Sequence, residues 1–404
     1  MGISNQTVQD KTNFKSELFQ VLRLNVQTYT ILLALIGIWA IFFFTTKGTY
    51  LAPQNISNLF RQMSVTAFLA AGMVLVIVTG NIDLSVGKLA GFVSVVAAYL
   101  QANFWYKYLP DQPLLSAVLT VIASLLVGSL FGAIQGYIIS FLRVPSFIVT
   151  LGGQWLLTGL ILLVTAGKTI PANQPWFSDI AQGYVPVTWG WIFCIVAIAF
   201  LFWNMFRSRQ NKRKHGFELQ NIYIDLLAVV FAAVVILVYV YNVNSYKGIQ
   251  NPVLLLAITA MIMIYVSNNT RFGRYSYAIG GNRDAARLSG ISISGMVFKI
   301  FVLMGFLSGV GGVVLASYVG YGTTAAGAGY ELDAIAACIL GGTSTLGGIG
   351  TIQGAMIGAL IIASLSTRFA NDERSACMAI CFEGHRAGSG CACRRVLQEE
   401  SINY

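Results

Sequence analysis

Long apolar runs dominate the pattern of hydrophobic and polar positions along the chain. A hydrocarbon core about 30 Å thick needs about 20 predominantly apolar residues in one helix, and runs close to that length recur from residue 29 to residue 366. The last run, over about 333–366, is interrupted by glycines. The other nine runs lie at about 29–46, 63–79, 86–103, 114–142, 147–167, 189–206, 221–243, 252–268 and 296–320.

This pattern predicts an all-α, polytopic transmembrane helical bundle of about 10–11 spans, because a bilayer leaves no water to satisfy backbone polar groups. Five glycines between residues 341 and 350 interrupt the last run. Irregular backbone at membrane depth is tolerated only where it is buried or lines a cavity. We therefore expect a re-entrant or broken helix near 333–366.

Composition excludes an ordinary soluble protein. Hydrophobic residues make up 56% of the 404 residues and charged residues only 10%, with a mean hydropathy of +0.71, whereas a soluble domain carries about 25% charged residues. The formal net charge of +10 would suggest nucleic-acid binding in a soluble chain. In a membrane protein it indicates basic loops on the cytoplasmic side.

The basic residues predict the orientation. Arg143, a cluster at 207–214, and the arginines at 271–287 all fall on the side of the polar N-terminus in a ten-run topology. We expect a cytoplasmic N-terminal segment at 1–28, a transmembrane domain at 29–367 and an atypical polar tail at 368–404. The cluster at 207–214 is either a topology signal or a patch for anionic lipids.

Small residues recur every fourth position on three stretches, and such spacing lets helix backbones approach closely in a membrane. Close packing within one chain is one interpretation, and a moving seam or a dimer interface is the other. The glycines are Gly128, Gly132 and Gly136, then Gly305 and Gly309, then Gly350, Gly354 and Gly358.

The sequence lacks the motifs of several kinds of chemistry. It has no phosphate-binding Walker loop, His215 and His385 have no metal-ligand company in the bundle, and no catalytic constellation is visible. We expect no cofactor and no metal. The chain therefore looks like a conduit driven from elsewhere, with a stand-alone secondary transporter or channel as the alternative.

Four segments resemble the permease subunits of bacterial binding-protein-dependent ABC sugar importers. They read GNIDLSVG at 80–87, VPSFIVTL at 144–151, AIGGNRDAARLSGI at 278–291, and LDAIAACILGGTS followed by GGIG within 332–350. The resemblance covers most of residues 50–367. It implies a homodimer in the bacterial inner membrane that works with a separate ATP-binding subunit and a periplasmic sugar-binding protein.

The extra pair of spans at 189–206 and 221–243 is similar to the members of this family that carry D-xylose. The resemblance thus implies D-xylose as the cargo. Ribose, galactose or branched-chain amino acids remain alternatives.

The resemblance also implies a loop at 270–292 that docks on the ATPase and transmits its closure. A short helix there would present Arg283 and Arg287 one turn apart to an acidic groove. A solvated loop that only anchors the topology is the alternative. The residues at issue are Asn282, Arg283, Asp284, Ala285, Ala286 and Arg287.

Other polar residues of the bundle are candidates for structural or transport roles. Asp83 and Ser85, with Gly87, form a helix-start motif in which an oxygen accepts from free backbone N–H groups. Lys88 departs from the small residue expected there, and a cation in the first turn of a helix opposes its dipole. The carboxylates at 331 and 333 either cap a helix or face the binding protein at the outer mouth, and the amides at 135 and 154 are pathway candidates. These four residues are Glu331, Asp333, Gln135 and Gln154.

The tail at 368–404 carries four of the six cysteines and is unlike the rest of the chain. Its cysteines and His385 match structural zinc motifs poorly. Shifting the reading frame by one base turns Met378–Ala379 into tryptophan, and the following codons permit a further apolar span with a basic end. We therefore hypothesise that a base change near codon 367 replaced a last transmembrane helix.

Overall fold

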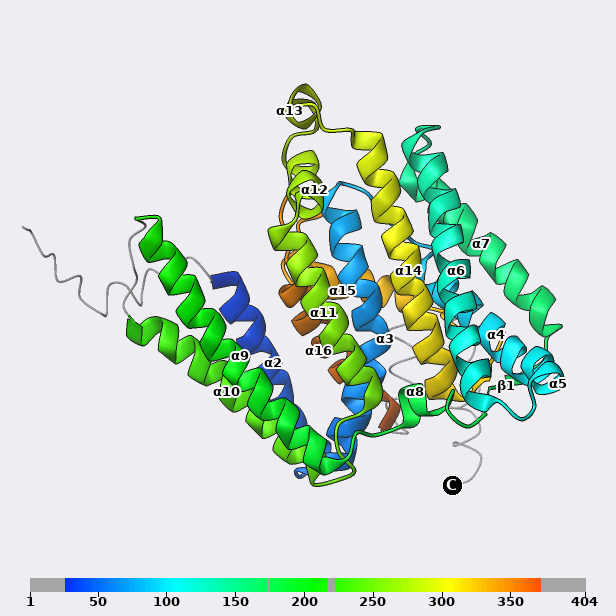
Figure 1. Ribbon diagram of the computed structural model, residues 1–404, viewed down its shortest axis with the longest axis horizontal. Coiled ribbons are helices and arrows are strands. Elements are labelled where there is room, and N and C mark those ends of the chain that lie inside the picture. The colour runs from blue at the N-terminus through cyan, green and yellow to red at the C-terminus, as the bar shows by residue number, and fades with distance from the viewer. Residues whose placement is uncertain (1–25, 173, 217–221, 372–404) are drawn as a thin grey trace, which may run out of the picture. The chain divides into compact units, whose positions relative to one another are not determined.

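The computed structural model of the protein describes residues 26–172, 174–216 and 222–371. Those residues are almost entirely helical (Figure 1). In chain order the elements are α2 (Val26–Thr45), η1 (Thr49–Leu51), α3 (Pro53–Val78), α4 (Val86–Tyr99), η2 (Leu100–Trp105), α5 (Tyr106–Tyr108), α6 (Pro113–Ser140), α7 (Ser146–Thr165), β1 (Ile170–Pro171), α8 (Asp179–Gln182), α9 (Val187–Lys214), α10 (Ile222–Asn244), α11 (Asn251–Asn269), α12 (Arg271–Gly281), α13 (Arg283–Leu288), α14 (Ile293–Val319), β2 (Tyr321–Gly322), α15 (Tyr330–Leu340) and α16 (Ile352–Asn371).

The helices confirm the polytopic bundle expected from the apolar runs. All ten runs coincide with helices, and the last run is divided into α15 and α16 by the glycine-rich turn. Within the described residues, seven helices are long and apolar enough to cross a membrane. They are α3, α6, α7, α9, α10, α11 and α14.

The chain divides into two compact units. Of the described residues, the first comprises 26–33, 185–216 and 222–249, and the second comprises 34–172, 174–184 and 250–371. In the first unit, α9 and α10 pack as an antiparallel pair around Cys194, Val240 and Ile249. The basic cluster at 207–214 lies on the last turns of α9 rather than in a loop, and cations there complement the helix dipole.

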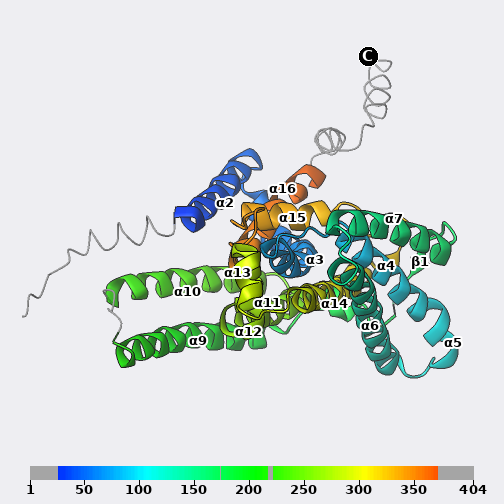
Figure 2. The same cartoon turned by 90° about the horizontal axis from the view of Figure 1, so that it is seen from above.

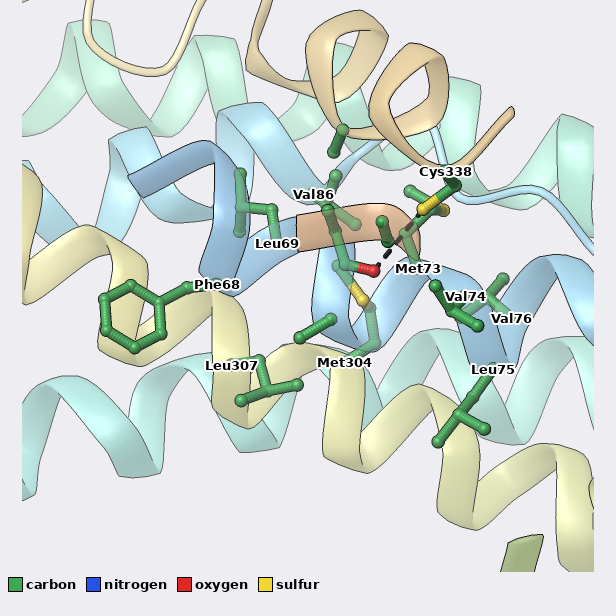
Figure 3. Close-up of a cluster of buried hydrophobic side chains, with 14 of the residues drawn as sticks. Phe68, Leu69, Met73, Val74, Leu75, Val76, Val86, Met304, Leu307 and Cys338 are labelled. Carbon is green, nitrogen blue, oxygen red and sulfur yellow. Dashed lines mark hydrogen bonds between the residues drawn. The ribbon is translucent and has the colours of Figure 1, made fainter. Parts of the chain in front are cut away.

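Helix α3 forms the centre of the second unit. Every residue of α3 from Met63 to Val78 is buried, as expected for a helix that is apolar on all faces. Figure 3 shows Phe68, Leu69 and Met73 of α3 among the side chains of α14, and the Cys338 thiol of α15 donates to the carbonyl oxygen of Ala70 at 3.4 Å.

The glycine stretches pack helices against each other within one chain. A Cβ atom on Gly132 of α6 would lie 2.4 Å from the carbonyl oxygen of Phe301, and one on Gly305 of α14 would lie 2.3 Å from that of Gly128. The interpretation as close packing is therefore confirmed for α6 and α14. Gly350 differs from the expectation, because it lies in the turn before α16 and its carbonyl accepts from the Tyr277 hydroxyl at 2.8 Å.

The second unit has two opposite ends, named here after the helices α13 and α8 that lie at them. The α13 end holds α12, α13 and the glycine-rich turn, where Gly348 N–H donates to the carbonyl oxygen of Val78 at 2.9 Å. The α8 end holds the pairing of β1 with β2 and the contact of α8 with Ser317. Figure 2 looks onto the α13 end and shows α15 and α16 beside α3.

Candidate functional site

Two helices begin at the same place inside the second unit and run to opposite ends. Helix α15 has 11 residues, too few to cross a ~30 Å core at 1.5 Å per residue, whereas α4 continues without a break through η2 and α5 to Tyr108. The segment before α15 packs on Gly87 and Gly91, where a Cβ would lie within 2.7 Å of backbone atoms of residues 326 and 327. The N-termini of α4 and α15 are therefore neighbours in the interior.

Asp83 and Ser85 lie at the start of α4, as the helix-start motif predicts. The Asp83 carboxylate accepts from the backbone N–H of Ser85 at 2.8 Å and from its hydroxyl at 2.6 Å. Asp83 is 2% exposed and Ser85 is fully buried. Asp83 thus accepts from one backbone N–H, whereas Ser85, the N-cap residue of α4, makes no side-chain cap hydrogen bond.

Gln135 of α6 extends this cluster. Its Oε1 atom lies 3.0 Å from the Ser85 hydroxyl oxygen, and its Nε2 atom is buried without a hydrogen-bond partner. Ser85 has a single hydroxyl proton, which Asp83 also attracts. If the amide were turned over, Nε2 would donate to Ser85 and Oε1 would lose its partner. Either orientation leaves one polar atom of Gln135 unsatisfied.

Glu331 lies on the other side of the same junction. Its side chain is 6% exposed, its Oε1 atom accepts from Gln154 Nε2 of α7 at 3.3 Å, and its Oε2 atom has no partner. A Cβ on Gly87 would fall 2.1 Å from Oε2, so only glycine leaves room for this carboxylate. Lys88 lies within electrostatic reach of Glu331.

These placements differ from the outer mouth expected for Glu331 and Asp333. Both residues lie in the first turn of α15, which begins in the interior beside α4, because the chain turns back along α4 before the helix starts. The Glu331 carboxylate reaches Gln154 rather than a surface. A contact of Glu331 with a second protein would therefore require the bundle to open.

The segment expected to dock on an ATPase forms two helices at the α13 end. Asn282 caps α13, and its Oδ1 atom accepts from the backbone N–H of Ala285 at 2.9 Å. Ala286 is buried, while Arg283, Asp284 and Arg287 are exposed. The short helix with a charged rim is thus confirmed as local structure.

A cavity of about 500 Å³ opens between α13 and the connection from α6 to α7. Its wall carries three arginines, several hydroxyls and the amide of Asn81, which precedes Asp83 by two residues. Among the described residues, none of the three arginines has a carboxylate within ion-pair distance. The arginines are Arg143, Arg283 and Arg287.

Sequence reasoning missed the junction of α4 with α15. The signal was present in Gly87 and Gly91, which are four residues apart and let a backbone approach α4. No group of residues in the described ranges has the composition of a metal site. The cysteines and histidine proposed for a zinc site in the tail lie outside the described residues.

Comparison with known proteins decides the family. Residues 55–371 match the family model described as the permease component of the branched-chain amino acid transport system. The chain belongs to this permease family. The protein is therefore a permease component of a transport system and a multi-pass membrane protein.

Relatives of this permease carry more specific names. It is 41% identical to the xylose transport system permease protein of Haemophilus influenzae over 86% of its own length and 90% of the relative. It is 39% identical to the protein of the same name from Escherichia coli K12, over 85% of each chain. The ribose import permease of Escherichia coli K12 is 32% identical over 80% of this chain and 79% of that one. No solved structure matches the chain.

Proposed function

We propose that this permease carries D-xylose into the bacterial cytoplasm as the membrane-spanning subunit of an ABC importer. The observation that carries the proposal is the greater identity to relatives named for xylose, 41% and 39%, than to a relative named for ribose, 32%. The matches extend over at least 80% of the chain, so they include most of the bundle.

The driving force would come from ATP hydrolysis on a separate subunit. Helix α13 supports this proposal because it is capped, exposed and rimmed by Arg283 and Arg287, which suits docking in an acidic groove. Closure of the ATPase would move α13, and α14 would carry that movement along the glycine seam with α6. The permease would work as a homodimer.

Delivery of the sugar would fall to a periplasmic binding protein at the α8 end, opposite α13. The contact of Glu331 and Asp333 with that protein stays a prediction. The arginines at 143, 283 and 287 all lie at the α13 end, which supports a cytoplasmic α13 end in the inner membrane. A cytoplasmic N-terminus stays a prediction.

Reconstitution in proteoliposomes tests the proposal. The permease is combined with its ATPase and with xylose-, ribose- or galactose-binding protein, and sugar uptake and ATP hydrolysis are measured. We expect xylose uptake that requires ATP, the ATPase and the xylose-binding protein together. Uptake without the ATPase, driven by an ion gradient, would instead establish a secondary transporter, and uptake of another sugar alone would change the cargo.

A further inference from the structure

We propose that the polar cluster at the junction of α4 and α15 is a monosaccharide-binding station within the translocation pathway. The cluster consists of Asp83, Ser85, Gln135, Gln154 and Glu331. This inference rests on the proposed function as a sugar permease and names the residues that would meet the sugar. It concerns any monosaccharide and does not require the cargo to be xylose.

The first argument is the cost of the cluster in a membrane. A buried polar group without a partner costs free energy, and burying a charge costs more. Gln135 is 5% exposed and Glu331 is 6% exposed, and each keeps one polar atom without a hydrogen bond. Other buried polar atoms of the described chain, such as Gln101 Oε1, also lack a hydrogen bond. What distinguishes this cluster is that two carboxylates and two amides meet in one place inside the bundle, and ionisable residues within a membrane typically mark substrate pathways.

The second argument is the chemistry that the cluster offers. A carboxylate accepts hydrogen bonds, an amide both donates and accepts, and a serine hydroxyl does both. A monosaccharide carries several neighbouring hydroxyls that need donors and acceptors at the same time. Asp83 is already engaged with Ser85, and the Glu331 carboxylate is stabilised by the backbone N–H groups of Gly329 and Glu331 and by Lys88. Glu331 Oε2 and the Gln135 amide keep capacity for a sugar hydroxyl, because a carboxylate oxygen accepts more than one hydrogen bond.

The third argument is position. Gln135 lies five residues before the end of α6 and Gln154 eight residues after the start of α7, which places the cluster roughly 8–12 Å inside the α13 end at 1.5 Å per residue. Helices α4 and α15 both begin there and run to opposite ends, and helix N-termini inside a bundle are typical of binding sites in transporters.

The fourth argument is a path out of the cluster. The cavity at the α13 end reaches Asn81, and the next residue, Ile82, donates its backbone N–H to the Ser146 hydroxyl at 3.4 Å. Ser146 itself lines the cavity. A sugar released from the cluster would enter a polar vestibule rather than an apolar helix interface. The chain between Asn81 and Asp83 would be the gate between station and vestibule.

A direct test measures uptake of a sugar and of its deoxy analogues, each lacking one hydroxyl, by the wild type and by three variants of the permease. Glu331→Gln preserves the shape of the side chain, and Gln135→Leu removes the unsatisfied amide. The matched control is Gln101→Leu, which removes a buried amide from a network with Thr120 outside the cluster. Each permease is assembled with its ATPase and binding protein, and uptake of the parent sugar is compared with that of the deoxy analogues which the binding protein delivers.

In the wild type, we expect removal of the hydroxyl that meets Glu331 or Gln135 to slow uptake about tenfold, the factor for one charge-assisted hydrogen bond. In Glu331→Gln or Gln135→Leu that difference should disappear, while Gln101→Leu should keep it. The concentration of loaded binding protein that half-maximally stimulates ATP hydrolysis should stay unchanged. Equal slowing of parent and analogue in the cluster variants would overturn the inference and leave a structural role.

A second experiment measures the chemical accessibility of the cluster and does not compare transport rates of variants. Ser85→Cys is nearly isosteric, and we expect its thiol to react with a small hydrophilic alkylating reagent only during turnover, with sugar slowing the reaction. The inference would be overturned if residue 85 were not labelled during turnover. It would also be overturned if sugar did not change the rate of labelling. If wild-type permease moves ribose or galactose but not xylose, the cargo proposal fails, and the same variants tested with that sugar still decide the cluster.

Discussion

Glycines at single positions determine how closely the helices of the bundle approach one another. Gly132 and Gly305 face each other across the seam of α6 and α14, where each would bring a Cβ within 2.4 Å of a backbone oxygen. By contrast, Gly152 and Gly159 of α7 have no atom within 4 Å of such a Cβ. The same residue type therefore has different roles in two neighbouring helices.

Gly132→Ala should destabilise the bundle, because overpacking against backbone costs about 1–3 kcal/mol. Gly159→Ala is the matched control and should be neutral or slightly stabilising, since alanine is the better helix former by up to ~1 kcal/mol. Thermal unfolding of both variants in the same detergent checks this. Equal melting temperatures would show that the seam relaxes around the added methyl group.

Some helices of this protein could be predicted from its sequence, and the contacts between them could not. The positions of the long apolar helices followed from the apolar runs alone, because a water-facing helix does not carry about 20 consecutive apolar residues. The short helices α8 and α12 coincide with no such run. The break between α15 and α16 followed from the glycines. The contact between the N-termini of α4 and α15 could not be predicted. It depends on residues 326 and 327, which lie about 240 residues after Gly87 in the chain and pack along α4. No periodicity within either helix carries that information.

Helix α13 is the element on which communication with an ATPase would depend. It has only six residues, so its cap contributes a large share of its stability. Asn282→Ala removes the acceptor for the Ala285 N–H, and loss of such a cap costs about 1 kcal/mol. We expect ATPase binding to weaken about fivefold, which corresponds to that energy.

Asn282→Ser is the control for this prediction, because serine caps helices about as well as asparagine does and adds no charge beside the proposed acidic groove. Binding of the ATPase can be measured by titration into permease-containing nanodiscs. The prediction requires normal affinity in Asn282→Ser and reduced affinity in Asn282→Ala. Reduced affinity in both variants would point to a direct role of the amide in docking.

At the scale of the whole molecule, the family match and the hypothesis for the tail can be compared. The match ends at residue 371, close to codon 367, where a frame change was hypothesised. The structure describes the chain only to that same residue, so the hypothesis stays a prediction. We expect the gene to contain an inserted or deleted base there when it is sequenced. An intact frame, with a peptide of matching mass from residues 375–394, would refute it.

The division into two units predicts that α9 and α10 can be removed together. Tyr184 and Gln250 flank them and form an antiparallel bridge within the second unit, and Asn251 N–H donates to the Gly183 carbonyl oxygen at 3.2 Å. A chain that joins residue 184 to residue 250 through a two-residue Asn-Gly turn should remain folded, because such turns close antiparallel strands.

Size-exclusion chromatography and thermal unfolding of the shortened chain check this prediction. We expect a single monodisperse peak and cooperative unfolding. A chain that lacks α6 and α7, which supply packing for α14 and α4, should aggregate. Aggregation of both shortened chains would mean that the pair α9 and α10 is needed for the bundle to fold.

The bridge between Tyr184 and Gln250 also bears on how the length of this family could change in evolution. Tyr184 and Gln250 pair with each other although 65 residues lie between them. The segment between them can therefore lengthen or shorten in evolution without shifting the helices on either side. Tolerance of an insertion depends on whether the backbone on either side keeps its burial and hydrogen bonds. Relatives that differ in length should therefore differ at this point, and a reporter domain spliced in here should be carried without disturbing transport.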